Sequence, residues 1–230
     1  MTVHRFFVAL GEAPPTDRFP LPASIAHQVR RVLRLRDGAP LVLLTGDGTQ
    51  IRCRLDGDAC VVESRALAGG EPVHRLTIVQ ALLKGDGLET VVQQGTEVGV
   101  SAFRLVVTER CVARELSPRR MERLRAIARE SAEQSERGRV PTIEDPRPFA
   151  DVLSAGGTLL SERSRGTGLA SITPSSVLVI GPEGGFSAGE LEAAEAAGMT
   201  LASLGPRILR AETVAAAAAA VVLSRTGDFA

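Results

Sequence analysis

Three short segments contain residue types that could bind a nucleoside, and each follows a run of apolar residues. They are Leu160–Ser164, Ile180–Phe186 and Leu204–Arg210. The middle segment contains the run GPEGG, whose glycines permit positive φ and leave backbone N–H groups unobstructed. Open α/β sheets bind ligands beyond the carboxyl ends of their strands. Because each segment comes after a strand pattern, we expect all three to share one such edge.

The residue types in these segments argue against some ligands and leave others open. Gly181–Gly185 lacks the lysine and hydroxyl residues of a P-loop, and its charged residue, Glu183, is acidic, so we disfavour phosphate. The chain also lacks the G-x-G-x-x-G motif of a Rossmann dinucleotide site. Gly181–Gly185 could hydrogen-bond the edge of a nucleoside, or it could be a tight strand-to-helix turn. Ile208 and Leu209 could bury an adenine ring, or they could fill a core.

The elements that would position these segments alternate between strands and helices after residue 72. Ser187 followed by Glu190 has the spacing of a capping box at a helix start, and Gly99 is placed to end another helix. We predict strands over 75–82, 102–107, 158–161, 177–180 and 199–204, and helices over 86–97, 117–138, from 187 onwards and over 211–224. This alternation predicts an α/β fold with a mostly parallel sheet.

Residues 1–70 have a different pattern, which predicts a small β-barrel. Four prolines, Pro14, Pro15, Pro20 and Pro22, impose an extended or turning path, and Ser24 could cap a short helix over 24–33. We predict strands over 4–9, 41–44, 51–55 and 59–63, joined in part by Asp-Gly turns. A linker at 68–72 would separate a domain of residues 1–70 from a second domain of residues 73–230.

The composition is that of a globular protein, with 44% apolar and 23% charged residues. The chain has no apolar run long enough to span a membrane and no secretory signal pattern, so we expect a cytoplasmic protein. Three cysteines and His4, His27 and His74 lack metal-ligand spacing, so we expect no metal. Arginine exceeds the acidic residues over 1–70 and 104–139, which favours a polyanionic partner.

Several motifs together resemble the RsmE family of 16S ribosomal RNA (uracil-N3) methyltransferases. LVIGPEGGFSAGEL and LGPRILRAETVAAAA look like the family's C-terminal signature. HRFFV, HQVRRVLRLRDGAPLVLLTGDG, LLKGDGLETVVQQGTEVGV and ARESAEQSERGRVPTI resemble its earlier segments. The resemblance therefore covers nearly the whole chain. Gln94-Gly95 and Arg123 depart from the residues common in the family.

The resemblance implies a fold, a cofactor and partners. The fold would be a SPOUT-type, trefoil-knotted, parallel-sheet α/β methyltransferase domain with a small N-terminal PUA-like RNA-binding β-barrel. The cofactor would be S-adenosylmethionine, bent within the knot. The partners would be 16S ribosomal RNA in the assembled small subunit and a second copy of the chain in a homodimer.

The resemblance also implies roles for individual residues. Arg210 could stabilise negative charge on a uracil oxygen, or it could pair with an acid; Glu212 or Glu183 could accept the N3 proton, although an acid at 212 also suits the start of a helix. The cofactor-binding candidates are Leu160, Ser161, Glu162, Ile180, Gly181, Glu183, Gly184, Gly185, Leu204, Gly205, Ile208 and Leu209. The RNA-contact candidates are Arg5, Arg30, Arg31, Arg34 and Arg36, for which an ordinary solvated surface is the alternative.

Two other functions remain open. A related knotted methyltransferase that modifies another RNA position would share the cofactor loops. A non-catalytic RNA-binding protein of ribosome assembly could keep the fold without binding S-adenosylmethionine. A nucleotide-dependent enzyme is disfavoured by the absence of lysine from GPEGG.

Overall fold

The computed structural model describes residues 3–8, 17–162 and 167–229, and the chain divides into two compact units. The first unit comprises Met1–Glu71 and Ala132–Val140, and the second comprises Pro72–Ser131 and Pro141–Ala230. The division after Glu71 falls within the linker predicted at 68–72. Residues 132–140 pack with the first unit, whereas the sequence pattern placed them in the second domain.

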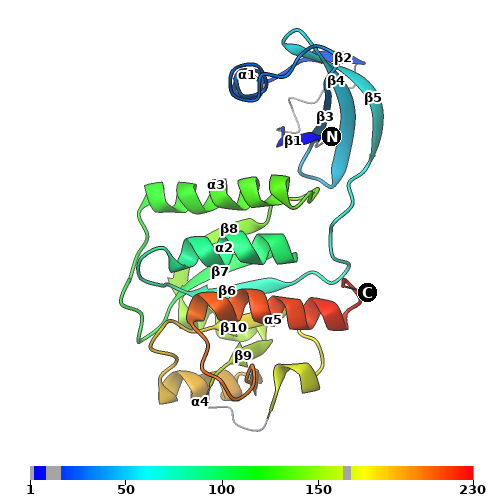
Figure 1. Cartoon of the computed structure of the whole chain (residues 1–230). Helices are drawn as coiled ribbons and strands as arrows, with labels where there is room; N and C mark the ends of the chain where they lie inside the picture. Colours follow the sequence, from blue (N-terminus) through cyan, green and yellow to red (C-terminus); the bar gives the residue numbers. More distant parts are fainter. Residues whose placement is uncertain (1–2, 9–16, 163–166, 230) are drawn as a thin grey trace. The chain divides into compact units, whose positions relative to one another are not determined.

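The first unit is built on a five-stranded sheet with the order β1-β3-β4-β5-β2 (Figure 1). β1 pairs with β3 in parallel, and the other neighbouring strands are antiparallel. Along β4, buried residues alternate with exposed ones from Ile51 to Asp56, as the period-two pattern predicts. The strands are β1 (His4–Phe7), β2 (Arg18–Pro20), β3 (Pro40–Leu44), β4 (Thr49–Asp56) and β5 (Ala59–Leu67).

Strand β2 was not predicted, because Pro20 suggested an irregular path. β2 lies at the edge of the sheet, where a proline removes no ladder hydrogen bond. The predicted first strand extends to Ala9, and Ala9, Pro14 and Pro15 lie outside the described residues.

Helix α1 (Ala23–His27) continues into a π-helical turn, Gln28–Val32. The prediction that Ser24 caps this helix is wrong, because Pro22 occupies the N-cap position and no side chain caps the helix. Proline suits a helix start because it has no N–H to leave unpaired there. The predicted apolar face is present at Ile25 and Val29, which are buried.

The second unit is built on a six-stranded sheet with the order β11-β9-β10-β6-β7-β8, in which every neighbouring pair is parallel. The strands are β6 (Thr77–Ala81), β7 (Ala102–Val107), β8 (Thr142–Pro148), β9 (Thr158–Leu160), β10 (Val177–Ile180) and β11 (Thr200–Ala202). β6, β9 and β10 are almost entirely buried, as strands covered on both faces should be. The predicted α/β fold with a parallel sheet is therefore confirmed.

Four α-helices accompany this sheet among the described residues: α2 (Gly87–Val98), α3 (Pro118–Gln134), α4 (Ala188–Ala196) and α5 (Ala211–Arg225). α2 packs against α5, and Figure 1 shows the two side by side in front of the strands. The predicted capping box at the start of α4 is present, because Ser187 and Glu190 cap one another's backbone N–H groups. α2 ends at Gly99, as predicted.

Two features of the second unit were not foreseen. β8 was missed because Pro146 and Pro148 interrupt a polar segment; it lies at the sheet edge, where prolines are tolerated. Gly95 on α2 faces Phe103 of β7, whose ring lies 2.8 Å from the place a Cβ would take. Gly95 therefore lets α2 approach the sheet closely over a large side chain, which gives a physical reason for this departure from the family pattern.

Candidate active site

The carboxyl ends of four neighbouring strands lie level with one another. In the register, Ile180 of β10 pairs with Leu160 of β9 and with Gln80 of β6, and Leu160 pairs with Ala202 of β11. The segments that follow β9, β10 and β11 therefore leave the sheet along one edge. These are the three segments that the sequence analysis selected.

The three segments enclose one side of a cavity of about 750 Å³. This volume lies in the range usual for pockets that bind small molecules and cofactors. Every predicted catalytic and cofactor-binding residue lines the cavity: Leu160, Ser161, Glu162, Ile180, Gly181, Glu183, Gly184, Gly185, Leu204, Gly205, Ile208, Leu209, Arg210 and Glu212. Arg163 and Ser164, the remaining residues of the first segment, lie outside the described residues.

The lining also includes residues that were not individual site candidates, although three of them lie within the selected segments. They are Lys84, Gly87, Pro182, Phe186, Ser203, Arg207, Ala211 and Val214. Lys84 follows β6, the neighbour of β10, and it is the only lysine of the chain. A strand end carrying the chain's one lysine was a signal for the site, but the segment after β6 lacks the glycine pattern that drew attention to the other loops.

Hydrogen bonds from outside the loop fix the backbone of residues 181–185. Gln80 Nε2 donates to the Gly181 carbonyl oxygen at 3.4 Å, and Arg110 Nη1 donates to that of Gly184 at 3.0 Å. Within the loop, the Gly185 N–H donates to the Pro182 oxygen at 2.9 Å. The loop is therefore held in one shape before any ligand binds, which reduces the entropic cost of binding.

Two positions of this loop favour glycine, one for lack of space and the other for its backbone conformation. A Cβ on Gly181 would lie 3.0 Å from the ring of Phe186, which is itself buried. Gly185 has a φ of +65°, which disfavours residues with a side chain.

The apolar lining differs in exposure from one segment to another. Ile180 and Leu160 are buried, whereas the Ile208 side chain is 84% exposed. Ile208 therefore does not fill a core, which was the alternative for it in the sequence. An exposed apolar side chain that lines a cavity could be covered by a flat ligand such as a purine.

Three acids and three bases line the cavity. Glu183 Oε1 accepts a hydrogen bond from the backbone N–H of Lys84 at 3.1 Å, which joins the segment after β10 to that after β6. Arg210 is the N-cap residue of α5, and Glu212 lies in the helix's first turn. Among the described residues, the Arg210 side chain pairs with no acid, so the ion pair considered as its alternative role is not formed.

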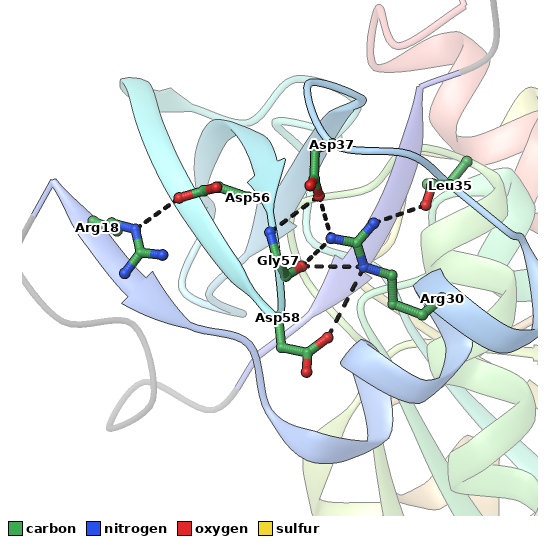
Figure 2. A network of polar contacts seen from close by, with 7 residues as sticks. All are labelled: Arg18, Arg30, Leu35, Asp37, Asp56, Gly57 and Asp58. Carbon is green, nitrogen blue, oxygen red and sulfur yellow. Dashed lines mark hydrogen bonds and ion pairs between the residues drawn. The ribbon is translucent and has the colours of Figure 1, made fainter.

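The five RNA-contact candidates lie in the first unit and fall into two groups. Arg5 forms an ion pair with Glu136 at 2.6 Å. Arg30 lies in the network of Figure 2, where it donates to Asp37 and to the carbonyl oxygens of Leu35 and Gly57. The remaining three are exposed and make no ion pair with a described residue: Arg31, Arg34 and Arg36.

The Arg30 network also affects an acid. The hydrogen bond from Arg30, with a second from the Gly57 N–H, holds the pKa of Asp37 below its usual value. Arg30 thus ties the segment after the π-helical turn to the β4–β5 turn. Because Arg30 precedes Arg31 and holds the Leu35 carbonyl between Arg34 and Arg36, it braces the part of the chain that carries the exposed arginines.

Metal-binding clusters and membrane-spanning helices are both absent from residues 3–8, 17–162 and 167–229. In these ranges, no three His, Cys, Asp or Glu side chains gather in a way that could hold a metal ion. The helices found there include none of the length and apolarity needed to cross a bilayer.

Comparison with known proteins places the chain among RNA methyltransferases. A family described as "RNA methyltransferase domain" matches residues 70–223. Ribosomal RNA small subunit methyltransferase E of Bacillus subtilis is 30% identical, with 92% of each chain covered. The protein of the same name from Synechocystis is 34% identical, over 85% of this chain and 69% of its own. The crystal structure of ribosomal RNA small subunit methyltransferase E from Neisseria gonorrhoeae bound to S-adenosyl methionine has a TM-score of 0.89, 28% identity and full coverage of both chains.

Proposed function

The chain belongs to the ribosomal RNA small subunit methyltransferase E family, and from this premise we propose that it methylates N3 of a uridine in 16S ribosomal RNA within the assembled small subunit. The methyl donor is S-adenosylmethionine, as family membership indicates. The observation that carries the proposal is the convergence of three strand-end segments on one cavity of about 750 Å³.

The cavity suits the donor in shape and chemistry. Backbone groups of Gly181, Gly184, Gly185 and Leu204 would hydrogen-bond it, and Leu160, Ile208 and Leu209 would contact its adenine. Bare glycine backbone, apolar side chains of different exposure and separated charges of both signs match a ligand that combines a flat base with a zwitterionic amino acid. Bound S-adenosylmethionine supplies an electrophilic methyl group on a sulfonium.

The protein must make uracil N3 nucleophilic and hold it in line with the methyl group. N3 gives its proton to the carboxylate of Glu183 or Glu212, and the electron pair left on N3 forms the bond to the methyl carbon. The methyl–sulfur bond breaks in the same step, and its electron pair stays on sulfur, which leaves as a neutral thioether. Arg210 stabilises the negative charge that spreads onto a uracil oxygen as the proton leaves. Alignment of the reacting atoms within the cavity contributes up to about 7–11 kcal/mol in favourable cases.

Further parts of the proposal follow from the family resemblance. The second unit forms a trefoil knot, the first unit is a PUA-like barrel that contacts RNA, two chains form the active dimer, and the protein acts in the cytoplasm. The strand order supports the knot, because β9, β10 and β11 are adjacent but out of sequence order. The parallel bridge between Gly168 and Ser203 supports it too, since it brings the chain after β9 beside the chain after β11.

Deletion of the gene, followed by mass spectrometry of small-subunit RNA, tests the assignment. We expect one N3-methyluridine to disappear and to return when purified protein and S-adenosylmethionine are added to subunits from the deletion strain. Naked 16S RNA from the same strain is the matched control, and it should remain unmodified.

Each other result has a distinct meaning. Unchanged N3-methyluridine in the deletion strain would contradict the uracil-N3 assignment. Loss of a different methylated nucleotide would favour another RNA position. Methylation of naked RNA but not of subunits would contradict the assembled substrate.

A further inference from the structure

Lys84 is unusual in two respects: it is the only lysine of the sequence, and it lines the cavity. Of the 27 lysine and arginine residues, Lys84 is the only lysine. On a solvated surface, arginine and lysine carry the same charge and replace one another readily. They are not interchangeable where a site needs a compact ammonium group in place of a broad, planar guanidinium. The chain's single lysine therefore draws attention to the place that it occupies.

The structure places this one lysine in the cavity. Lys84 follows β6, which lies on the side of β10 away from β9 and β11. Its backbone N–H holds Glu183 Oε1, so the residue's main chain is fixed. Its side chain is exposed and makes no ion pair with a described residue.

Lys84 lies on the side of the cavity that the proposed donor-binding segments do not supply. Those segments follow β9, β10 and β11, whereas Lys84 and Gly87 come from the connection between β6 and α2. The start of α5, with Arg210 and Glu212, lines the cavity as well. These residues therefore line a part of the cavity other than the one formed by the proposed donor-binding segments after β9 and β10.

We propose that the Lys84 ammonium contacts the uracil base and stabilises the charge that develops on one of its two ring carbonyl oxygens, while Arg210 serves the other. This proposal rests on the function proposed above. Loss of the N3 proton spreads negative charge over N3, O2 and O4. The two carbonyl oxygens lie on either side of N3, which carries the attacking electron pair. Two cations from different segments match that distribution, and they disfavour cytosine, which carries an amino group in place of O4.

The other charged groups that line the cavity determine the electrostatic environment of Lys84. They are Glu183 after β10, Glu162 after β9, and Arg207, Arg210 and Glu212 between β11 and α5. With Lys84 these groups comprise three acids and three bases, so removing the lysine leaves the cavity with an excess of negative charge. That excess opposes formation of a uracil anion, which makes the rate of methyl transfer sensitive to this side chain.

Single-turnover methylation of subunits from the deletion strain tests the proposal with Lys84→Met and Lys84→Arg. The Lys84→Met rate should fall by about 10²–10³-fold, the usual effect of removing one group that stabilises an oxyanion. Lys84→Arg should also lose at least about tenfold, because the planar guanidinium would place its charge and its donors differently from a compact ammonium. Arg147→Lys, an exposed change on β8, is the matched control and should leave the rate unchanged.

Two further measurements separate chemistry from folding. Calorimetry should give the same dissociation constant for S-adenosylmethionine in wild type and both variants. The pH–rate profile of Lys84→Met should rise at higher pH than that of wild type, because alkali removes the N3 proton without help from the lysine. A merely structural role would not move this profile.

The proposal is overturned if Lys84→Met keeps the wild-type rate, or if it loses S-adenosylmethionine binding and rate together. A Lys84→Arg variant as active as wild type would also overturn the requirement for an ammonium. If wild-type protein itself fails to make N3-methyluridine, the proposed function fails, and that result is distinct from these.

Discussion

At the scale of single residues, Gly181 shows how the site depends on the absence of a side chain. Gly181→Ala would place a methyl group 3.0 Å from the Phe186 ring, which is buried and has little room to move. We expect a loss of about 1–3 kcal/mol of stability, the usual cost of overpacking, and at least tenfold weaker binding of S-adenosylmethionine. Urea denaturation and calorimetry measure these two effects.

Gly189→Ala is the matched control for this change. Gly189 lies in helix α4, and a Cβ there meets nothing within 4 Å. Alanine should therefore cost no stability and leave donor binding unchanged. Equal binding by the Gly181→Ala variant and wild type would remove the loop from the donor site.

The identity of the proton acceptor is also decided by single residues. Glu183→Gln keeps an oxygen that accepts the Lys84 N–H, and Glu212→Gln keeps the shape of the first turn of α5. The variant that lacks the base should lose about 10²–10⁴-fold in methyl-transfer rate with unchanged donor affinity, and the other should lose far less. Wild-type rates in both variants would exclude both acids.

At the scale of elements, the arginines of the first unit divide into two groups. Arg30 stabilises the local fold through its network, whereas the exposed arginines are available to contact RNA. The combined change Arg31→Ala, Arg34→Ala and Arg36→Ala should weaken binding to small subunits and reduce its salt dependence. Each phosphate that is no longer neutralised lowers the slope of log K against log salt by about 0.7–0.9. Titrations at several salt concentrations measure the slope, and an unchanged slope would place these arginines away from the RNA.

Arg30→Ala is the contrasting variant, because Arg30 is engaged with Asp37, Leu35 and Gly57. It should lower the stability of the first unit as well as RNA affinity. The triple variant should keep the wild-type melting temperature. A triple variant that melts early would mean that the exposed arginines support the fold.

The same network predicts a dependence of stability on pH. The folded pKa of Asp37 is lowered by its hydrogen bonds from Arg30 and Gly57, so its contribution is present above the unfolded pKa, about 3.9, and is lost as pH falls through the folded value. Wild type should therefore exceed Asp37→Asn in stability at pH 7, and the difference should narrow as pH falls below about 4. Urea denaturation at pH 7 and pH 3 measures the gap, and a gap equal at both would contradict the network.

Much of the element pattern was predictable, for local reasons. β7 and β10 have the predicted bounds because mainly apolar runs, interrupted in β7 by Arg104, end at polar or glycine residues. Ser187 caps α4 through short-range hydrogen bonds with Glu190. β2 and β8 were missed because proline excludes central strands but not edge strands, and a single sequence does not reveal which strands are edges. The place of Lys84 was missed for a similar reason: adjacency of β6 and β10 is a property of the sheet.

At the scale of the whole molecule, the assembly of the site was predictable from one rule, that α/β sheets bind ligands beyond the carboxyl ends of their strands. That rule gathered three segments from different strand ends, and all of their described residues except Pro206 line one cavity. The rule gives no information on chain threading or on partner subunits. The knot and the dimer therefore stay predictions that rest on resemblance.

The proposed dimer is testable by light scattering during gel filtration. We expect twice the mass of one chain across a wide range of protein concentration, since obligate dimers bury large surfaces. A mass of one chain at all concentrations, in a preparation that methylates subunits at the full rate, would contradict the dimer as the active form.

A chain with one lysine also has one ε-amino group, and that group lies in the cavity. Among the side chains, reagents that acylate amines would therefore attach to Lys84 alone. Peptide mass mapping would then report directly whether the cavity is filled, since a bound occupant shields the amine from acylation. The protein thus carries its own internal probe of occupancy and needs no engineered label.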